Sequence, residues 1–224
     1  SAYFYTKYKN IYLLGAFDIM VPGFLIAQAS GRWGNFFNRE AHGGVIGGTT
    51  DLGLPALDVD GQRAFLTETL HLPDWIANQM YNPPGAEFSG NYYHPTFFYE
   101  SMWNIIGFII ILIIRRTKWL KSGDLLAFYL IWYSTGRFFI EGMRTDSLYI
   151  GNTGLRTAQI ISLIMIVGGI VFFAFNRLKL KTKFYHEVLE ETAALNEIAK
   201  FEEEAKKAEL NQVNDDSSNN DTKT

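Results

Sequence analysis

The sequence predicts an all-α polytopic membrane protein with about four transmembrane helices, a small irregular head outside the membrane and a polar C-terminal tail. Three observations support this class: four apolar segments of spanning length, a long polar and aromatic segment after the first of them, and basic residues clustered at their other ends. The chain contains no cysteine, which excludes disulfides, thiol chemistry and cysteine-based metal sites.

The four apolar segments cover residues 11–29, 97–114, 125–140 and 158–175. Because a spanning helix takes about 20 mostly apolar residues, each segment is just long enough. The fourth carries no charge and is the clearest span. The first contains Asp18, which we expect to pair with an arginine or to line a polar cavity.

Basic residues set the expected orientation. Half of the 20 lysines and arginines form three clusters: Lys7 and Lys9; Arg115, Arg116, Lys118 and Lys121; Arg177, Lys179, Lys181 and Lys183. With four spans, all three clusters fall on one side, which the positive-inside rule makes cytoplasmic. Residues 30–96 then lie on the other side, with only three arginines against seven acidic residues.

The segment 30–96 is rich in Gly, Pro and Asp, and we expect it to form the head, with a few short strands and turns such as Asp58–Gly61. Residues 1–183 should form the membrane unit and residues 184–224 a separate cytoplasmic tail. We expect that tail to be helical to Val213, disordered from Asn214, and dispensable.

The most informative motif is GRWGNFFNREAHG, residues 31–43, which directly follows the first span. Charged residues at a bilayer boundary are costly and indicate a functional site. The Arg32 guanidinium is a planar fork of donors that suits a phosphate, and the glycines allow the backbone to turn sharply. The motif therefore predicts a site for a lipid headgroup.

A second polar group lies at the end of the third span. Tyr133, Arg137 and Glu141 are spaced by four, so they share one helix face, and Arg144 joins that face if the helix continues. One interpretation is an ion pair that fixes helix packing. We favour an anion site lined by Arg137 and Arg144, because two arginines exceed what one carboxylate needs.

His94 and Glu100 open the second span. His94 can exchange a proton near neutral pH, and Glu100 should face protein rather than lipid. A hydrogen-bonded structural histidine is the alternative reading of His94. We expect His42, His71 and His186 to be structural or exposed, and no metal site is predicted, because the histidines lack ligand spacing.

The motif at residues 31–43 resembles the signature of the prolipoprotein diacylglyceryl transferase family, Gly-Arg-x-Gly-Asn-Phe-x-Asn-x-Glu-x-x-Gly, and matches every fixed position. Two further blocks are similar to the same family, and the resemblance covers about Tyr8 to Phe175. The blocks are His94-Pro95-Thr96 with Tyr99-Glu100, and Tyr133 with Arg137, Glu141, Arg144 and Asp146.

The resemblance implies an enzyme of the bacterial cytoplasmic (inner) membrane. Its reaction moves the diacylglyceryl group of phosphatidylglycerol to the lipobox cysteine thiol of a prolipoprotein signal peptide, forming a thioether and releasing glycerol phosphate. The partners are those two substrates and the lipid bilayer, with no cofactor, metal or nucleic acid. The active site is expected on the extracytoplasmic side and the C-terminus in the cytoplasm.

The resemblance also assigns site residues. The expected catalytic residues are Arg32, Arg137, His94 and Glu141. The expected substrate-binding residues are Arg32, Asn35, Asn38, Glu40, Gly43, Glu100, Tyr133, Arg137 and Arg144. Within these sets the asparagines would hydrogen-bond the headgroup or an adjacent backbone, and Glu40 and Glu141 would hold the arginines.

One departure concerns catalysis. The family carries a His-Gly-Gly motif upstream of the signature, and these 224 residues do not include it. We therefore expect the chain to be a fragment that is inactive alone. One alternative is a transporter subunit, but the sequence lacks the internal repeats that such transporters often show. The other alternative is a non-catalytic phospholipid-binding protein.

Overall fold

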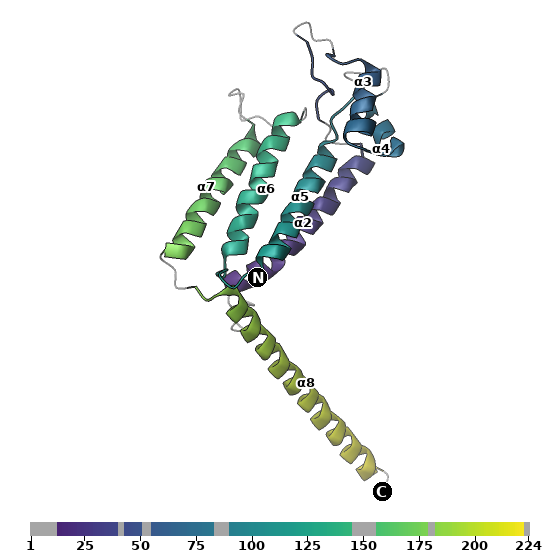
Figure 1. The fold of residues 1–224 in the computed structure, drawn as a ribbon. Coiled ribbons are helices and arrows are strands. Elements are labelled where there is room, and N and C mark those ends of the chain that lie inside the picture. Colours follow the sequence, from purple (N-terminus) through teal and green to yellow (C-terminus); the bar gives the residue numbers. More distant parts are fainter. Residues whose placement is uncertain are drawn as a thin grey trace.

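A computed structural model describes residues 13–39, 43–50, 55–82, 90–144, 156–178 and 182–221. Four long helices lie side by side in a bundle, with a small head at one end and a fifth long helix leaving from the other (Figure 1). The bundle helices are α2 (Leu13–Phe37), α5 (Thr96–Ile114), α6 (Asp124–Met143) and α7 (Thr157–Leu178), and the fifth is α8 (Tyr185–Asp221). The predicted helical membrane class is confirmed.

Three of the bundle helices, α2, α5 and α7, are long and apolar enough to cross a membrane. They match the first, second and fourth predicted spans to within a few residues, except at the end of α2. Helix α6 has 20 residues but carries Asp124, Arg137 and Glu141, which lower its apolar content. It nevertheless packs between its neighbours, against α7, α5 and α2.

Helix α2 ends later than predicted. It continues through the signature to Phe37, so the expectation that Gly31 and Gly34 turn the backbone is wrong. A Cβ at either glycine would meet no heavy atom within 4 Å, which means that both occupy an open helix face. The helix ends at Phe37, and two residues later Arg39 has a left-handed φ of 56° and donates its N–H to the Phe36 carbonyl.

The head is more helical than predicted. It contains α3 (Val59–Ala64), the π-helical turn η1 (Phe65–Thr69), α4 (Asp74–Gln79) and a two-residue hairpin of β1 (Tyr81–Asn82) and β2 (Asn91–Tyr92). The turn expected at Asp58–Gly61 is instead the first turn of α3. The Asp58 carboxylate caps this helix by accepting the Gly61 N–H at 3.0 Å.

A small apolar core joins the head to the bundle. Side chains from the ends of α2 and α5 pack with residues of the head, so the head is fixed on these two helices. Figure 1 shows the head above the ends of α2 and α5. The buried members are Phe36, Ile46, Leu66, Leu72, Ile76, Ala77, Met80, Tyr92 and Phe97.

Two tryptophans fix α5 against α6. Trp103 and Trp132 stack at 4.4 Å, and each indole N–H donates to the backbone carbonyl of the other residue, at 2.9 and 3.0 Å. The rings pack on Gly107 and Gly136, where any side chain would overlap them. This reciprocal contact fixes the relative positions of the polar residues on the two helices.

Asp18 does not pair with an arginine, which was one of the two expectations for it; the other was that it lines a polar cavity. Its buried carboxylate accepts the backbone N–H groups of Gly123 at 2.5 Å and Leu126 at 2.9 Å. These donors belong to the start of α6, where helical N–H groups lack partners within the helix. Asp18 therefore caps α6 from α2 at the end of the bundle opposite the head.

Helix α8 begins inside the bundle unit. The Tyr185 N–H donates to the Leu120 carbonyl at 2.9 Å, and Tyr185 and Val188 are both 2% exposed. The helix then continues to Asp221, beyond the disorder expected from Asn214. Residues 184–224 contain neither glycine nor proline, the residues that most readily end a helix.

Candidate functional site

Four predicted site residues meet near the head end of the bundle. Glu100 of α5 forms ion pairs with Arg32 of α2 through one oxygen and with Arg137 of α6 through the other, the latter at 3.5 Å. Arg137 also pairs with Glu141, one turn further along α6, at 2.9 Å. Three helices thus bring two arginines and two glutamates together, and we refer to these four residues as the outer ion cluster.

The two kinds of charge in the outer ion cluster differ in exposure. The glutamate side chains are about 5% exposed, whereas those of Arg32 and Arg137 are 20% and 22% exposed. One terminal nitrogen of Arg137 lies 3.5 Å from Glu100 without forming a hydrogen bond to it. The carboxylates therefore support the arginines from within, and both arginine side chains remain partly exposed.

Two more arginines border the outer ion cluster. Arg144 follows α6 with an extended backbone, so it does not continue the Tyr133–Arg137–Glu141 helix face, but its charge acts on Glu100. Arg156 donates to the backbone carbonyl of Glu141. The described part of the site thus contains four arginines and two glutamates and carries net positive charge.

The end of the signature connects α5 and α6. The Gly43 N–H donates to the His94 carbonyl and the Gly44 N–H to the Met143 carbonyl, each at 3.0 Å, and Gly43 also bridges to Arg144. A Cβ at Gly43 would lie 2.7 Å from that of His94, so only glycine allows this close approach. Gly43 contacts protein backbone here rather than an open cavity.

His94 lies just before α5, outside the outer ion cluster. Its Nδ1 is 3.1 Å from the Tyr99 hydroxyl, and its ring makes an edge contact with Phe65. Burial lowers the pKa of His94 below 6.5, because desolvation penalises the imidazolium form. The ring is therefore neutral at pH 7 and has a nitrogen that can accept a proton.

The other predicted residues are distributed around the cluster. Asn35 is half-buried, three residues after Arg32 on α2, and Asn38 is exposed just beyond that helix. Tyr133 lies one turn before Arg137 on α6. Glu40, His42 and Asp146 lie outside the described residues, while His71 and His186 are exposed as expected.

Arg156 and the pair of Gln28 and Tyr129 were not predicted. The Gln28 amide donates to the Tyr129 hydroxyl at 2.7 Å, which links α2 to α6 one turn inside Arg32. Arg156 immediately precedes the charge-free apolar run of α7. That position at a span boundary is the signal by which the argument used for Arg32 would have found it.

The arrangement is suited to binding an anion at a membrane surface. Guanidinium groups present paired donors to a phosphate, and buried carboxylates fix their orientation. Within residues 13–39, 43–50, 55–82, 90–144, 156–178 and 182–221, no three His, Asp or Glu side chains form a metal-binding group. The described part of the site offers two arginine side chains, and the neutral imidazole of His94 lies in the segment just before α5.

Comparison with known proteins agrees with this reading. The family described as prolipoprotein diacylglyceryl transferase matches residues 1–175. The phosphatidylglycerol–prolipoprotein diacylglyceryl transferase of Listeria innocua is 47% identical over 187 residues, 84% of this chain and 58% of that protein. The enzyme of the same name from Lysinibacillus sphaericus is 49% identical over 181 residues, 81% of this chain and 58% of that protein.

The chain thus spans less than two thirds of the length of these curated relatives. The match to the family nevertheless covers most of its own length, including every residue of the outer ion cluster. The chain belongs to the prolipoprotein diacylglyceryl transferase family.

Proposed function

We propose that this chain forms part of an enzyme that transfers the diacylglyceryl group of phosphatidylglycerol to the lipobox cysteine of prolipoproteins. The outer ion cluster carries this proposal, because it presents guanidinium donors where a phospholipid phosphate would lie. The names of the relatives supply the two substrate classes.

In this proposal α6 is the fourth span of a protein of the bacterial inner membrane. Its charged residues near the head turn toward α2 and α5 rather than toward lipid, which makes their insertion tolerable. Arg115, Arg116 and Arg177 lie at the opposite end of the bundle and favour placing that end in the cytoplasm. The outer ion cluster then faces the outer leaflet, with the C-terminus inside.

Arg32 and Arg137 bind the phosphate of the donor lipid. As the phosphate leaves, negative charge grows on the oxygen that linked it to glycerol, and fixed positive charge stabilises that change. Glu100 and Glu141 are positioning residues, since they contact the arginines rather than the lipid. Arg144 adds charge, and Asn35 and Asn38 hydrogen-bond the headgroup.

The transfer is a displacement at a glycerol carbon. The cysteine thiolate attacks that carbon, a carbon–sulfur bond forms, and the carbon–oxygen bond to the phosphate breaks, with its electron pair leaving on glycerol phosphate. The thiol proton must go to a base, because the thiolate is the nucleophile. His94 is our candidate base within this chain, since its imidazole is neutral at pH 7.

The test is a transferase assay with phosphatidylglycerol and a lipobox peptide in bilayer discs. This chain is compared with a chimera that carries, before it, the N-terminal part of the Listeria innocua relative. We expect the thioether product with the chimera alone. Inactivity of both, with correct insertion demonstrated, would contradict the proposal and favour a phospholipid-binding role without catalysis.

A further inference from the structure

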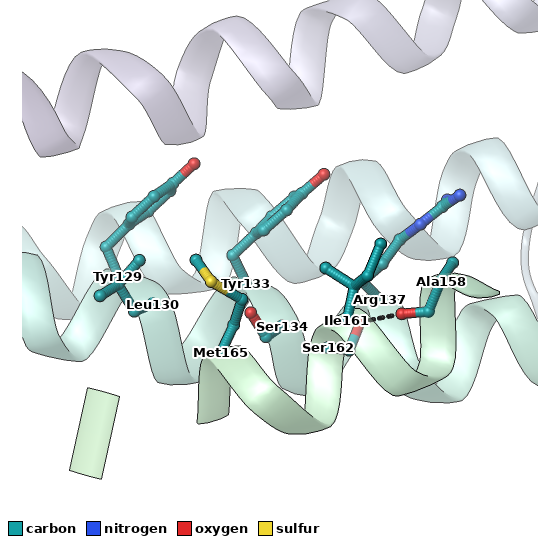
Figure 2. Close-up of a pocket in the computed structure, with 9 residues that line it drawn as sticks. All are labelled: Tyr129, Leu130, Tyr133, Ser134, Arg137, Ala158, Ile161, Ser162 and Met165. Carbon is teal, nitrogen blue, oxygen red and sulfur yellow. Dashed lines mark hydrogen bonds between the residues drawn. The ribbon is translucent and has the colours of Figure 1, made fainter. Parts of the chain in front are cut away.

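A polar cavity of about 230 Å³ lies in the head, and we refer to it as the head pocket. Its walls come from the end of the signature, the end of α4 and the segments around β1 and β2: Arg39, Gln79, Met80, Tyr81, Asn82 and Tyr93. It shares no residue with a cavity between α6 and α7, where Figure 2 shows Tyr129, Tyr133 and Arg137 in a row. That cavity contains Arg137 and belongs to the site already described.

Packing of α2 on α4 brings the walls of the head pocket together. The rings of Phe36 and Trp75 make an edge contact, with centroids 5.7 Å apart. Arg39 follows three residues after Phe36 and lines the pocket together with Gln79, the last residue of α4. Beyond Arg32, α2 continues for about 8 Å at the rise of an α-helix before it ends. The head pocket therefore lies on the head side of the outer ion cluster.

Arg39 has a backbone conformation that its residue type rarely adopts. Its φ of 56° is left-handed, where glycine is less strained than a residue with a long side chain. Residue 39 is one of the unspecified positions of the family signature, so the motif does not require arginine here. Unfavourable conformations of this kind cluster at binding and catalytic sites. The Arg39 side chain is exposed and forms no ion pair with another described residue, so its guanidinium is available at the rim of the pocket.

The head pocket also contains an acceptor without a donor. The side-chain oxygen of Gln79 is buried and accepts no hydrogen bond from the described part of the chain. A buried acceptor in this state is unfavourable, so a ligand that donates to it gains affinity. A bare anion would satisfy Arg39 alone, because it brings no donor. A small molecule with both an anionic group and hydroxyl groups satisfies both residues.

We propose that the head pocket binds glycerol phosphate, the leaving group of the transfer, an inference that rests on the proposed function. The phosphate pairs with the Arg39 guanidinium, and a glycerol hydroxyl donates to the Gln79 oxygen. The cavity is smaller than the roughly 300–1,000 Å³ of drug-sized ligand sites, which suits a molecule of this size. An intact phospholipid fits less well, because five of the six lining residues carry polar groups that an acyl chain cannot satisfy.

This site gives the head a part in turnover. Glycerol phosphate held by Arg39 no longer occupies Arg32 and Arg137, which must take up the next lipid. The two phosphate sites differ in what they select. The outer ion cluster lies at the end of the spans, where a phospholipid headgroup lies, whereas the head pocket accepts only a phosphate that has been separated from its acyl chains.

The test titrates glycerol phosphate into the chimera in maltoside micelles and follows the broadening of its phosphorus NMR line. The principal variant is Arg39→Gly, because glycine adopts a left-handed φ readily and preserves the turn. Gln79→Leu removes the inner acceptor, and Arg63→Ala, at an exposed arginine elsewhere in the head, is the matched control. Each titration is repeated with phosphatidylglycerol in the micelles, because this lipid competes for the outer ion cluster and not for the head pocket.

We expect saturable broadening that added phosphatidylglycerol does not abolish. Arg39→Gly should raise the dissociation constant roughly tenfold, the value of one hydrogen bond to a charged group, while the melting temperature stays the same or rises. Gln79→Leu should raise the constant for glycerol phosphate roughly fivefold and leave that for methyl phosphate unchanged at pH 8, since methyl phosphate lacks the hydroxyl donors. Arg63→Ala should bind like the unchanged chimera.

Two results would overturn the proposal. Affinity that survives Arg39→Gly, or that disappears when phosphatidylglycerol is added, would mean that glycerol phosphate binds in the outer ion cluster instead. The readout needs no turnover, so it is independent of the transferase assay. Binding that depends on Arg39 in a chimera without activity would support the head pocket while the proposed function fails. Transfer without such binding would reject the head pocket alone.

Discussion

Both ends of the bundle contain acidic and basic side chains, but the acidic side chains have different partners at the two ends. At the end away from the head, Asp18 accepts backbone N–H groups of α6, and Asp124 pairs with Arg177 and accepts from Asn176 at 3.1 Å. In the outer ion cluster, Glu100 pairs with Arg32 and Arg137, and Glu141 pairs with Arg137, whose side chain is 22% exposed. At the end away from the head the two aspartates accept backbone N–H groups at the start of α6 and so fix helices together. In the outer ion cluster Glu100 instead holds two partly exposed arginines from different helices, which could contact a ligand.

The largest effect is expected from the arginines of the outer ion cluster. Arg32→Lys in the active chimera should lower kcat by ~10²–10³-fold, because lysine keeps the charge and loses the paired donors that stabilise the leaving phosphate. Thermal unfolding in detergent should barely change. Arg63→Lys, on the exposed surface of the head, is the matched control. Full activity of Arg32→Lys would remove this residue from the phosphate site.

Changes at the end of the bundle away from the head should lower the free energy of unfolding rather than kcat. Ending the chain after Lys183 was expected from the sequence to be harmless. The structure changes that expectation, because the deletion removes the buried side chains of Tyr185 and Val188 and should cost about 3 kcal/mol of unfolding free energy.

Ending the chain after Leu195 is the control for this deletion, since it keeps both buried residues and removes a part of α8 in which Ile198 and Phe201 are 54% and 71% exposed. Equal stability of the two truncated proteins, measured by thermal or denaturant unfolding in detergent, would show that the start of α8 does not hold the bundle together.

A smaller loss of stability is expected from the cap between α2 and α6. Asp18→Ala leaves two buried N–H groups without an acceptor and should cost about 2 kcal/mol, while kcat of the chimera changes less than with Arg32→Lys. Asp18→Asn keeps one acceptor oxygen and should lose about half as much. If Asp18→Ala instead abolished turnover with unchanged unfolding, the comparison between the two ends would fail.

Much of this division could be predicted from spacing and charge. Apolar length located α2, α5 and α7, and the four-residue spacing of Arg137 and Glu141 predicted their ion pair. The partner that joins Arg32 to Arg137 is Glu100, and it could not be predicted, because it depends on how three helices pack. The same reason explains why the actual partners of Asp18 were not predicted. They are backbone N–H groups at the start of α6, and a contact with a helix start more than 100 residues away cannot be recognised in the sequence.

Local signals failed where packing overrode them. Glycines at 31 and 34 are typical of a turn, yet α2 continues through them, because they face open space and the helix gains contacts through Trp33 and Phe36. The polar composition of the tail gave no indication that Tyr185 and Val188 are buried. Their burial depends on packing near the start of α6, where the Tyr185 N–H donates to the Leu120 carbonyl. The average composition of a segment cannot predict that two residues at its start are buried.

The smallest effect concerns His94, which lies between the head and the outer ion cluster. Burial lowers its pKa below 6.5, so as the pH falls through 6.5 the unfolded chain takes up a proton that the folded protein does not. Folding stability should therefore decline below pH 6.5 by less than about 1 kcal/mol, since the ring is only half-buried and solvent screens it.

His94→Gln should remove this part of the slope in unfolding measured from pH 5 to 8, whereas His186→Gln, on the exposed surface of α8, should keep it. A slope unchanged by His94→Gln would mean that the folded protein accommodates the imidazolium at no cost, which would weaken the case for a neutral base at this position.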